Sequence, residues 1–299
     1  MCSLLELFCD IDDFCQEYEP IIQQMRIENG LAHRQRSCEM SLSELMTIEV
    51  HFHQKQFRNF KTYYTEHVAE HLSKEFPKLL SYTRFIQLRP RILVALCAYL
   101  QRCYGSCTGL SFVDSSALSV CHNRRIKQHR VFEDVAEHGR TSVDWFYGFK
   151  LHLVVNDCGE ILACCVTPGN MDDRQPVPRL MQQIHNLFGK LYGDKGYLSA
   201  KLNQELLEDY LVQLVTKLRK NMKNKLIDEI DKYFLRKRAI VESIYDQLKN
   251  VSQIEHTRHR SLTGFMTNLL AGLIAYCHQP KKPSLNLQFL NQLAVLKQN

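Results

Sequence analysis

Two aspartates, Asp114 and Asp194, each follow a short run of residues that is predicted to be a β-strand. The runs occupy residues 110–113 and 190–193. Catalytic groups gather at the carboxyl ends of strands in open α/β sheets, so the two carboxylates are expected to lie at one edge. Together with a third acid they could hold a pair of Mg²⁺ ions about 3.5–4 Å apart. The pattern therefore predicts metal-dependent phosphodiester chemistry.

Glu242 is the third candidate ligand, on a helix predicted from about 228 to 250. At about 100° per residue, Arg238, Glu242 and Lys249 fall within roughly 40° of one stripe. The face beside this stripe is apolar and would anchor the helix in the core, through Ile240, Val241, Ile244 and Leu248. The two cations suit DNA phosphates near a scissile bond. Helix geometry alone favours a plainer interpretation, a solvated Arg–Glu pair.

The segment from about 109 onward has the element order of a mixed α/β sheet with helices packed on it. Residues 149–155 alternate with period two, residues 156–159 form a turn and residues 161–166 make a second strand, which together predict a hairpin. Further helices are expected near 177–188, 197–210 and 261–277, and a further strand at 211–215. We assign 109–279 to a catalytic domain and 280–299 to a C-terminal tail.

Residues 1–108 are predicted to form a separate helical domain. The apolar spacing between Leu4 and Phe14 indicates an amphipathic helix, and Ser41 with Glu44 forms a capping box at the start of another. A short basic helix is predicted at 81–91, and an apolar one follows Pro90. Several short helices ending in a basic one suit a helix-turn-helix-like DNA-binding module. An ordinary helical cap on the next domain fits the same pattern.

The composition is that of a folded protein, with 45% hydrophobic residues and a net charge of +6. That charge suits a polyanionic partner but is common in other proteins as well. The N-terminus carries acidic residues within its apolar run, unlike a signal peptide, so we expect that the protein is not exported. In the reducing cytosol its cysteines would then be thiols. The twelve cysteines have irregular spacing, which favours small buried hydrophobes over zinc ligands. The sequence has no run of about eighteen uncharged apolar residues, so we expect no membrane span.

Three acidic motifs in order make the chain resemble the DDE transposases of bacterial insertion sequences. The motifs are Phe-Val-Asp114, Tyr-Gly-Asp194-Lys-Gly-Tyr197 and the Arg238, Glu242 and Lys249 set, whose Arg-x₃-Glu-x₆-Lys spacing is complete. Residues 148–152 and 168–173 are similar to the hairpin and following loop of that family. The resemblance covers about 109–278. One departure is Leu235, which stands where many relatives have a tyrosine, so a base-stacking role for that position does not carry over.

The resemblance implies an RNase H-like fold in which Asp114, Asp194 and Glu242 are both the catalytic residues and the metal ligands. The cofactor would be two Mg²⁺ ions, or Mn²⁺. It further implies a transposase that cuts DNA at the transposon ends and transfers the strands into target DNA. The partners would be double-stranded DNA, carrying terminal inverted repeats or the target site, and a second copy of the chain in a homodimer. The expected location is the bacterial cytoplasm, in association with the nucleoid.

Basic residues near the acidic motifs are candidates for DNA contacts. One cluster follows the first strand, a second lies at 217–225 and a third continues toward Glu242. Each alone is typical of a solvated surface, but together they flank the proposed ligands and predict a groove that follows phosphates. The predicted DNA-binding residues are Arg238, Lys249, Lys195, Arg124, Arg125, Arg219, Lys220, Lys223 and Arg84.

Two other functions fit part of the sequence. The first is an RNase H-like nuclease that cuts DNA without joining it, which a strand-transfer assay would distinguish. The second is a DNA-binding protein descended from a transposase that has lost catalysis. The presence of all three acids argues against the second alternative.

Overall fold

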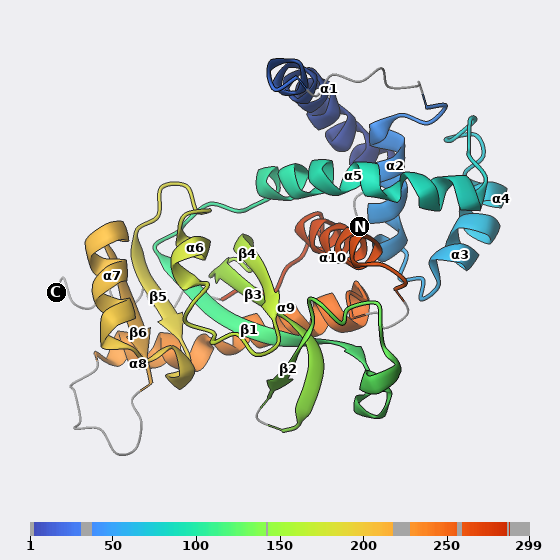
Figure 1. Ribbon diagram of the computed structural model, residues 1–299. Coiled ribbons are helices and arrows are strands. Elements are labelled where there is room, and N and C mark those ends of the chain that lie inside the picture. The colour runs from blue at the N-terminus through green and yellow to red at the C-terminus, as the bar shows by residue number, and fades with distance from the viewer. Residues whose placement is uncertain are drawn as a thin grey trace. The chain divides into compact units, whose positions relative to one another are not determined.

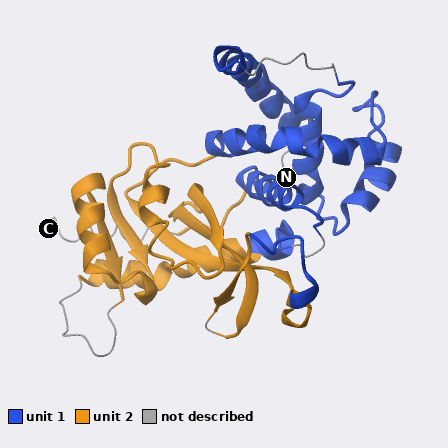
Figure 2. Ribbon diagram, viewed as in Figure 1, with its two compact units in different colours: residues 1–103, 127–134, 247–280 blue, residues 104–126, 135–246, 281–299 orange. Residues whose placement is uncertain are grey.

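The structure, a computed structural model, describes residues 3–30, 38–141, 143–217, 228–255, 259–285 and 287 (Figure 1). Contacts divide the chain into two compact units, a helical unit and a sheet unit (Figure 2). The helical unit draws on the ranges 1–103, 127–134 and 247–280, and the sheet unit on 104–126, 135–246 and 281–299. Each unit therefore combines segments that lie far apart in the sequence.

The helical unit is built around three long helices from its N-terminal part and one from near the C-terminus. Its elements are α1 (Leu4–Glu28), α2 (Leu42–Gln54), α3 (Phe60–Thr62), the π-helical η1 (Tyr63–Val68), α4 (Ala69–His71), α5 (Tyr82–Arg102), the π-helical η4 (Gln247–Val251) and α10 (Leu262–Cys277). The predicted capping box at Ser41 is confirmed, and Ser3 forms another at the start of α1. Helix α10 packs against α5 and α2.

This packing differs from the domain boundaries expected from the sequence. Helix α10 contacts the N-terminal helices and lies in the same unit as they do. The sequence analysis had assigned it to the catalytic segment 109–279. The helix has an apolar surface on nearly all sides, including Leu269, Leu270 and Ile274, which are buried. A helix of this kind must be surrounded by other elements, and periodicity alone does not say which ones.

Helix α5 continues through Pro90, where the sequence predicted a break. A proline inside a helix removes one backbone hydrogen bond and crowds the preceding turn. Residues on both sides of it share one buried face, among them Phe85, Leu88, Ile92 and Leu96. The burial of that continuous face outweighs the local cost of the proline. The separate basic helix expected at 81–91 is therefore the first half of a longer helix.

The sheet unit has a six-stranded mixed sheet. Its strands are β1 (Leu110–Cys121), β2 (Glu137–Arg140), β3 (Trp145–Asn156), β4 (Ile161–Pro168), β5 (Gly189–Gly193) and β6 (Val212–Thr216). The order is β2-β3-β1-β5-β6, and β4 also pairs with β3. The pairs β4-β3 and β3-β1 are antiparallel, while β1-β5 and β5-β6 are parallel. The predicted hairpin at 149–166 and the expected RNase H-like mixed sheet are confirmed.

Helices cover both faces of this sheet (Figure 1). Val113 and Leu191 lie in one core with residues of α6 (Val177–Met181) and α7 (Ala200–Tyr210). The adjacent strand residues Phe112 and Tyr192 point the other way, because successive side chains alternate between faces. Their rings lie 5.6 Å apart, and Tyr192 in turn contacts Phe234 of α8 (Glu229–Lys237). Helix α9 (Ala239–Asp246) follows α8 and contacts β1.

The helix predicted over 228–250 is divided into α8, α9 and η4. At the first break, the N–H of Val241 donates to the carbonyl of Arg238 at 3.0 Å, which is a tighter turn than an α-helix. From Gln247 onward the chain has the wider bonding of a π-helix. The helix expected at 177–188 is also shorter, because α6 ends at Met181.

Two further expectations concern cysteines and membranes. Among the cysteines that the structure describes, Cys15 and Cys165 are buried, as expected. Cys9, Cys97 and Cys158 are exposed, so the expectation of small buried hydrophobes is wrong for these three, and the other six are half-buried. Among the described helices, none has the length and apolar character needed to cross a bilayer.

Candidate active site

Asp114 lies in β1, and Asp194 directly follows the neighbouring strand β5. The parallel pairing of β1 with β5 ends at Phe112 opposite Tyr192, and each aspartate lies two residues further along its chain. The sequence predicted that this strand ends at residue 113. Strand β1 instead continues to Cys121, where it pairs with β3 alone. Adjacent strands lie about 4.8 Å apart, so the two aspartates are near neighbours.

The environment of Asp114 is mostly closed to solvent, with its side chain 19% exposed. Burial raises the pKa of this carboxyl to about 6, although Arg238 and the backbone N–H of Ser115 oppose the shift. The negative charge of Asp194 raises the pKa further. Asp194 itself accepts a hydrogen bond from the N–H of Gly196 at 2.7 Å, which fixes the start of the Asp-Lys-Gly-Tyr turn.

Arg238 lies at the break between α8 and α9 and joins two of the predicted ligands. Its Nη1 donates to Oδ2 of Asp114 at 2.7 Å, and its Nη2 donates to Oε1 of Glu242 at 3.0 Å. The arginine side chain is 17% exposed. Burial alone would lower the pKa of Arg238, but the charges of Asp114, Glu242 and Asp194 outweigh it and raise the pKa. The guanidinium group is thus held between Asp114 and Glu242, and the charge of Asp194 acts on it as well.

Glu242 is held differently from the two aspartates. Its side chain is 61% exposed, and Arg238 is four residues earlier. This is the Arg–Glu helical pair that the plainer interpretation of the sequence anticipated. The same arginine also reaches the half-buried Asp114 of β1, which makes it more than a surface pair.

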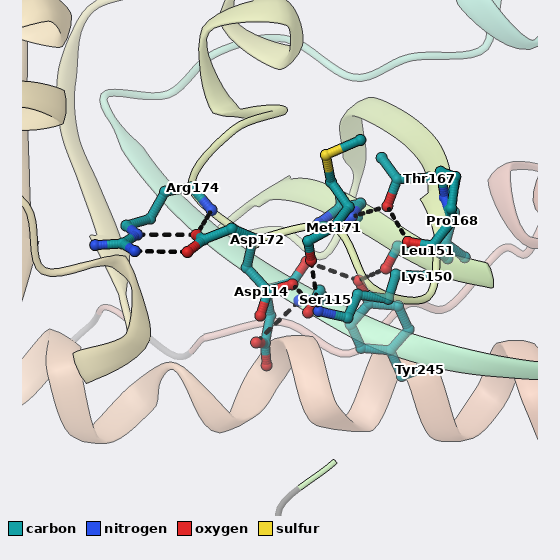
Figure 3. Close-up of polar contacts among 12 residues, drawn as sticks. Asp114, Ser115, Lys150, Leu151, Thr167, Pro168, Met171, Asp172, Arg174 and Tyr245 are labelled. Carbon is teal, nitrogen blue, oxygen red and sulfur yellow. Dashed lines mark hydrogen bonds and ion pairs between the residues drawn. The ribbon is translucent and has the colours of Figure 1, made fainter. Parts of the chain in front are cut away.

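Tyr245 ties α9 to the sheet at Asp114. Its hydroxyl lies 2.8 Å from the carbonyl oxygen of Asp114 and 2.9 Å from that of Leu151, so one donor faces two acceptors (Figure 3). Sequence analysis did not single out Tyr245. The signal was available, since a tyrosine on the apolar face of a helix must find a partner for its hydroxyl when buried.

The loop after β4 adds charged groups beside Asp114 (Figure 3). Lys150 of β3 donates to the carbonyl of Met171 at 2.8 Å and pairs with Asp173 at 2.9 Å. Arg174 pairs with Asp172 and lowers the pKa of that carboxyl to about 2. The charges of Asp114 and Asp173 both raise the pKa of the buried Tyr245 hydroxyl, after the larger effect of burial. The loop is thus held against the acidic site by Lys150.

The donor set suits a divalent cation, but its geometry is that of an ion-pair network. Asp114, Asp194 and Glu242 offer carboxylate oxygens, which Mg²⁺ prefers. Within the described residues, no three His, Cys, Asp or Glu side chains are grouped so that they could hold a metal ion. The pairing of Arg238 with two of the acids accounts for this arrangement. The assignment of the three acids as ligands stays a prediction.

The predicted DNA-binding residues have several different placements. Arg124, Arg125 and Lys195 are exposed in the sheet unit, and Arg84 is exposed in α5. Arg238 is half-buried beside Asp114 and Glu242, and its role in DNA binding stays a prediction. Three others, Arg219, Lys220 and Lys223, lie outside the described residues.

Lys249 departs from the stripe predicted for it. The stripe assumed a uniform α-helix, but α9 ends at Asp246 and Lys249 lies in the π-helical η4. Lys249 belongs to the helical unit, where it pairs with Glu255 at 3.2 Å. Leu235, at the position where a tyrosine was expected from the resemblance, is 4% exposed and offers no surface for stacking.

Comparisons with known proteins point to one family. A sequence profile described as a transposase DDE domain matches residues 104–262, more than half of the chain. Among solved structures, the cryo-EM structure of the piggyBac transposase synaptic complex with hairpin DNA is similar, with 12% sequence identity and a TM-score of 0.49. That similarity covers 98% of this chain and 79% of the other. Comparison with curated proteins finds no match.

Proposed function

The chain belongs to the transposase DDE domain family, and from this premise we propose that it is the transposase of a bacterial insertion sequence. It would cleave DNA at the transposon ends and transfer the freed 3′-hydroxyl strands into target DNA. Asp114, Asp194 and Glu242 are the proposed catalytic residues. The observation that carries the proposal is the double ion pair by which Arg238 joins Asp114 and Glu242.

The same three residues would hold the divalent cations, two Mg²⁺ or Mn²⁺ ions. When bound, these cations would supply an activated hydroxide or 3′-hydroxyl and stabilise the leaving oxygen. Asp114 lies in β1 and Asp194 directly follows β5, whereas Glu242 would reach the site from α9. The exposure of Glu242 leaves its side chain free to change rotamer, and Tyr245 keeps its helix attached to β1.

Arg238 has two alternative sets of partners in this proposal. In the structure it neutralises Asp114 and Glu242. A DNA phosphate would offer the guanidinium an equivalent bidentate partner, because arginine matches carboxylate and phosphate geometry alike. If the Arg238 guanidinium moved to a DNA phosphate, the carboxylates of Asp114 and Glu242 would become available to a metal cation. Binding of DNA and of metal would then favour one another.

Exposed cations outside the acidic site are the proposed contacts to the DNA backbone. Arg124, Arg125 and Lys195 lie in the sheet unit, and Arg84 in the helical unit is assigned to recognition of the transposon end. Such contacts position a protein on duplex DNA and make its affinity depend on salt. A homodimer and association with the bacterial nucleoid in the cytoplasm complete the proposal.

The decisive experiment replaces each proposed ligand and measures cleavage, strand transfer and DNA binding separately. Asp114→Asn, Asp194→Asn and Glu242→Gln should each abolish cleavage in Mg²⁺ while the affinity for DNA remains. Asp209→Asn, at an exposed position in α7, is the matched control and should cleave like the parent. Full cleavage by the Asp194→Asn protein would remove that residue from the site.

The same assay separates the alternatives. A parent protein that cuts the ends without joining them would be an RNase H-like nuclease. A parent protein that binds DNA but neither cuts nor joins would be a DNA-binding descendant of a transposase.

A further inference from the structure

The β2–β3 hairpin presents an exposed aromatic side chain that the proposed mechanism does not use. Trp145 is the only tryptophan in the chain and begins β3. Its side chain is 56% exposed, and Val143 beside it in the turn is 91% exposed. Strand β2 pairs only with residues 145–148 of β3, so this end of the hairpin extends beyond the rest of the sheet (Figure 1). The hairpin therefore offers apolar surface to an outside partner.

Hydrogen bonds link the described residues on either side of the hairpin turn. The N–H of Thr141 donates to the carbonyl of Asp144 at 2.9 Å, and the N–H of Asp144 donates to the Thr141 hydroxyl at 3.0 Å. The N–H of Trp145 donates to Oδ1 of Asp144 at 2.7 Å. On the other side, Nδ2 of Asn123 donates to the carbonyl of Trp145 at 2.8 Å. The backbone of Trp145 is thus fixed by Asp144 through its N–H and by Asn123 through its carbonyl.

One arginine packs against this tryptophan, and two more follow a residue that contacts its backbone. The guanidinium carbon of Arg140, its cross-strand partner, is 5.6 Å from the ring centroid. Arg124 and Arg125 are exposed and directly follow Asn123, which holds the Trp145 backbone. The nearest carboxylate in the turn, Asp144, accepts from the Trp145 backbone. An aromatic ring among arginines matches a polyanion whose units carry flat rings.

We propose that Trp145 is a stacking platform for an unpaired base of the DNA substrate, with Arg124, Arg125 and Arg140 contacting the adjoining phosphates. Aromatic side chains stack on bases of any sequence, and arginines follow the backbone beside them. The inference rests on the proposed function, since DNA must be the partner. It adds that the enzyme distinguishes DNA with unpaired bases from intact duplex.

Trp145 reports on its own environment, because no other tryptophan contributes to the emission. The intrinsic fluorescence of the full chain would be followed while three probes are added: a duplex with a five-nucleotide single-stranded overhang, the same duplex with blunt ends, and heparin. Stacking should quench the emission with the overhang DNA and leave it nearly unchanged with the blunt duplex or heparin. Equal quenching by heparin would mean that only charge is recognised and would overturn the proposal.

Variants then test the energetic contribution. Trp145→Ala should bind the overhang DNA about tenfold more weakly, bind the blunt duplex as the parent does, and melt like the parent. Trp145→Phe keeps a ring and should bind the overhang DNA nearly as tightly as the parent. Phe188→Ala is the matched control, because Phe188 is an aromatic residue of the same unit that is 54% exposed. It should change neither affinity.

The outcomes separate this inference from the proposed function. If Trp145→Ala keeps its affinity for the overhang while the parent cleaves DNA, the stacking role is wrong and the transposase function stands. If the parent binds none of the DNA probes, both are wrong. Emission that changes with protein concentration alone, without DNA, would identify the hairpin as a contact between two copies of the chain and would exclude the stacking role.

Discussion

At the scale of single residues, Arg238 determines how the acidic site is held. Its guanidinium pairs with Asp114 at 2.7 Å and with Glu242 at 3.0 Å, in surroundings that leave it 17% exposed. A fixed positive charge between two carboxylates does electrostatically what a divalent cation would do there. The Arg238 guanidinium and a divalent cation therefore compete for the same carboxylate oxygens. Removing the guanidinium should favour binding of the metal ion.

Arg238→Gln is accordingly predicted to bind Mn²⁺ about tenfold more tightly than the parent in the absence of DNA, a change of roughly 1.4 kcal/mol. Isothermal titration calorimetry measures it directly. The variant should also show a shallower slope of log affinity for DNA against log salt, by about one charge. Arg174→Gln removes the arginine that pairs with Asp172 and is the control for a general loss of positive charge. Equal Mn²⁺ affinity in the Arg238→Gln protein and the parent would contradict the competition.

At the scale of elements, α9 carries Glu242, and Tyr245 fastens that helix to the sheet. The Tyr245 side chain is buried, and its hydroxyl faces the carbonyl oxygens of Asp114 and Leu151. Removing the hydroxyl would leave at least one of these buried acceptors without its partner, which costs about 1–2 kcal/mol. The change also loosens the link between the strand of one proposed ligand and the helix of another.

Tyr245→Phe is predicted to lower the free energy of unfolding by about 1–2 kcal/mol in a denaturant titration. Cleavage should fall, while the affinity for DNA and its salt dependence stay as in the parent. Tyr210→Phe provides the comparison, because the Tyr210 hydroxyl makes a single long hydrogen bond of 3.4 Å to Pro178. Its effect on stability should stay within about 0.5 kcal/mol. An unchanged denaturation midpoint for Tyr245→Phe would mean that the hydroxyl does not anchor α9.

At the scale of the whole molecule, the helical unit combines the N-terminal segment 1–103 with the distant segment 247–280. Helix α10 packs against α2 and α5, and its side chains Leu269, Leu270, Leu273 and Ile274 are buried. A fragment that begins near residue 104 would keep α10 but lose the helices that cover it. The apolar surface released in this way favours aggregation.

The fragment 104–299 is therefore predicted to bind the dye ANS several-fold more strongly than the full chain and to elute as aggregates in size-exclusion chromatography. A second fragment, 104–246, lacks α10 as well as the N-terminal helices. It should bind less of the dye than 104–299, which keeps α10 uncovered. If 104–299 were monomeric, melted cooperatively and bound little dye, α10 would not depend on the N-terminal helices.

Local sequence patterns were sufficient to predict strands that begin at Leu110 and lead into Asp194, the hairpin of β3 and β4, and a helical conformation around Glu242. Each of these follows from the period of the side chains and from nearby turn residues, which act over a few positions. The order of the acidic motifs completed the fold class, because an RNase H-like sheet requires those strands in that order. The capping box at Ser41 is local in the same sense.

Only the tertiary structure decided which groups of distant segments meet. Nothing in the sequence states that Arg238 reaches Asp114, 124 residues away, or that the Tyr245 hydroxyl reaches the Asp114 carbonyl. The continuity of α5 through Pro90 and the placement of α10 with α2 and α5 were also beyond local patterns. The physical reason is the same for all four. Burial and ion pairing are gained between distant segments, and these gains outweigh the preference of any one residue for its local conformation.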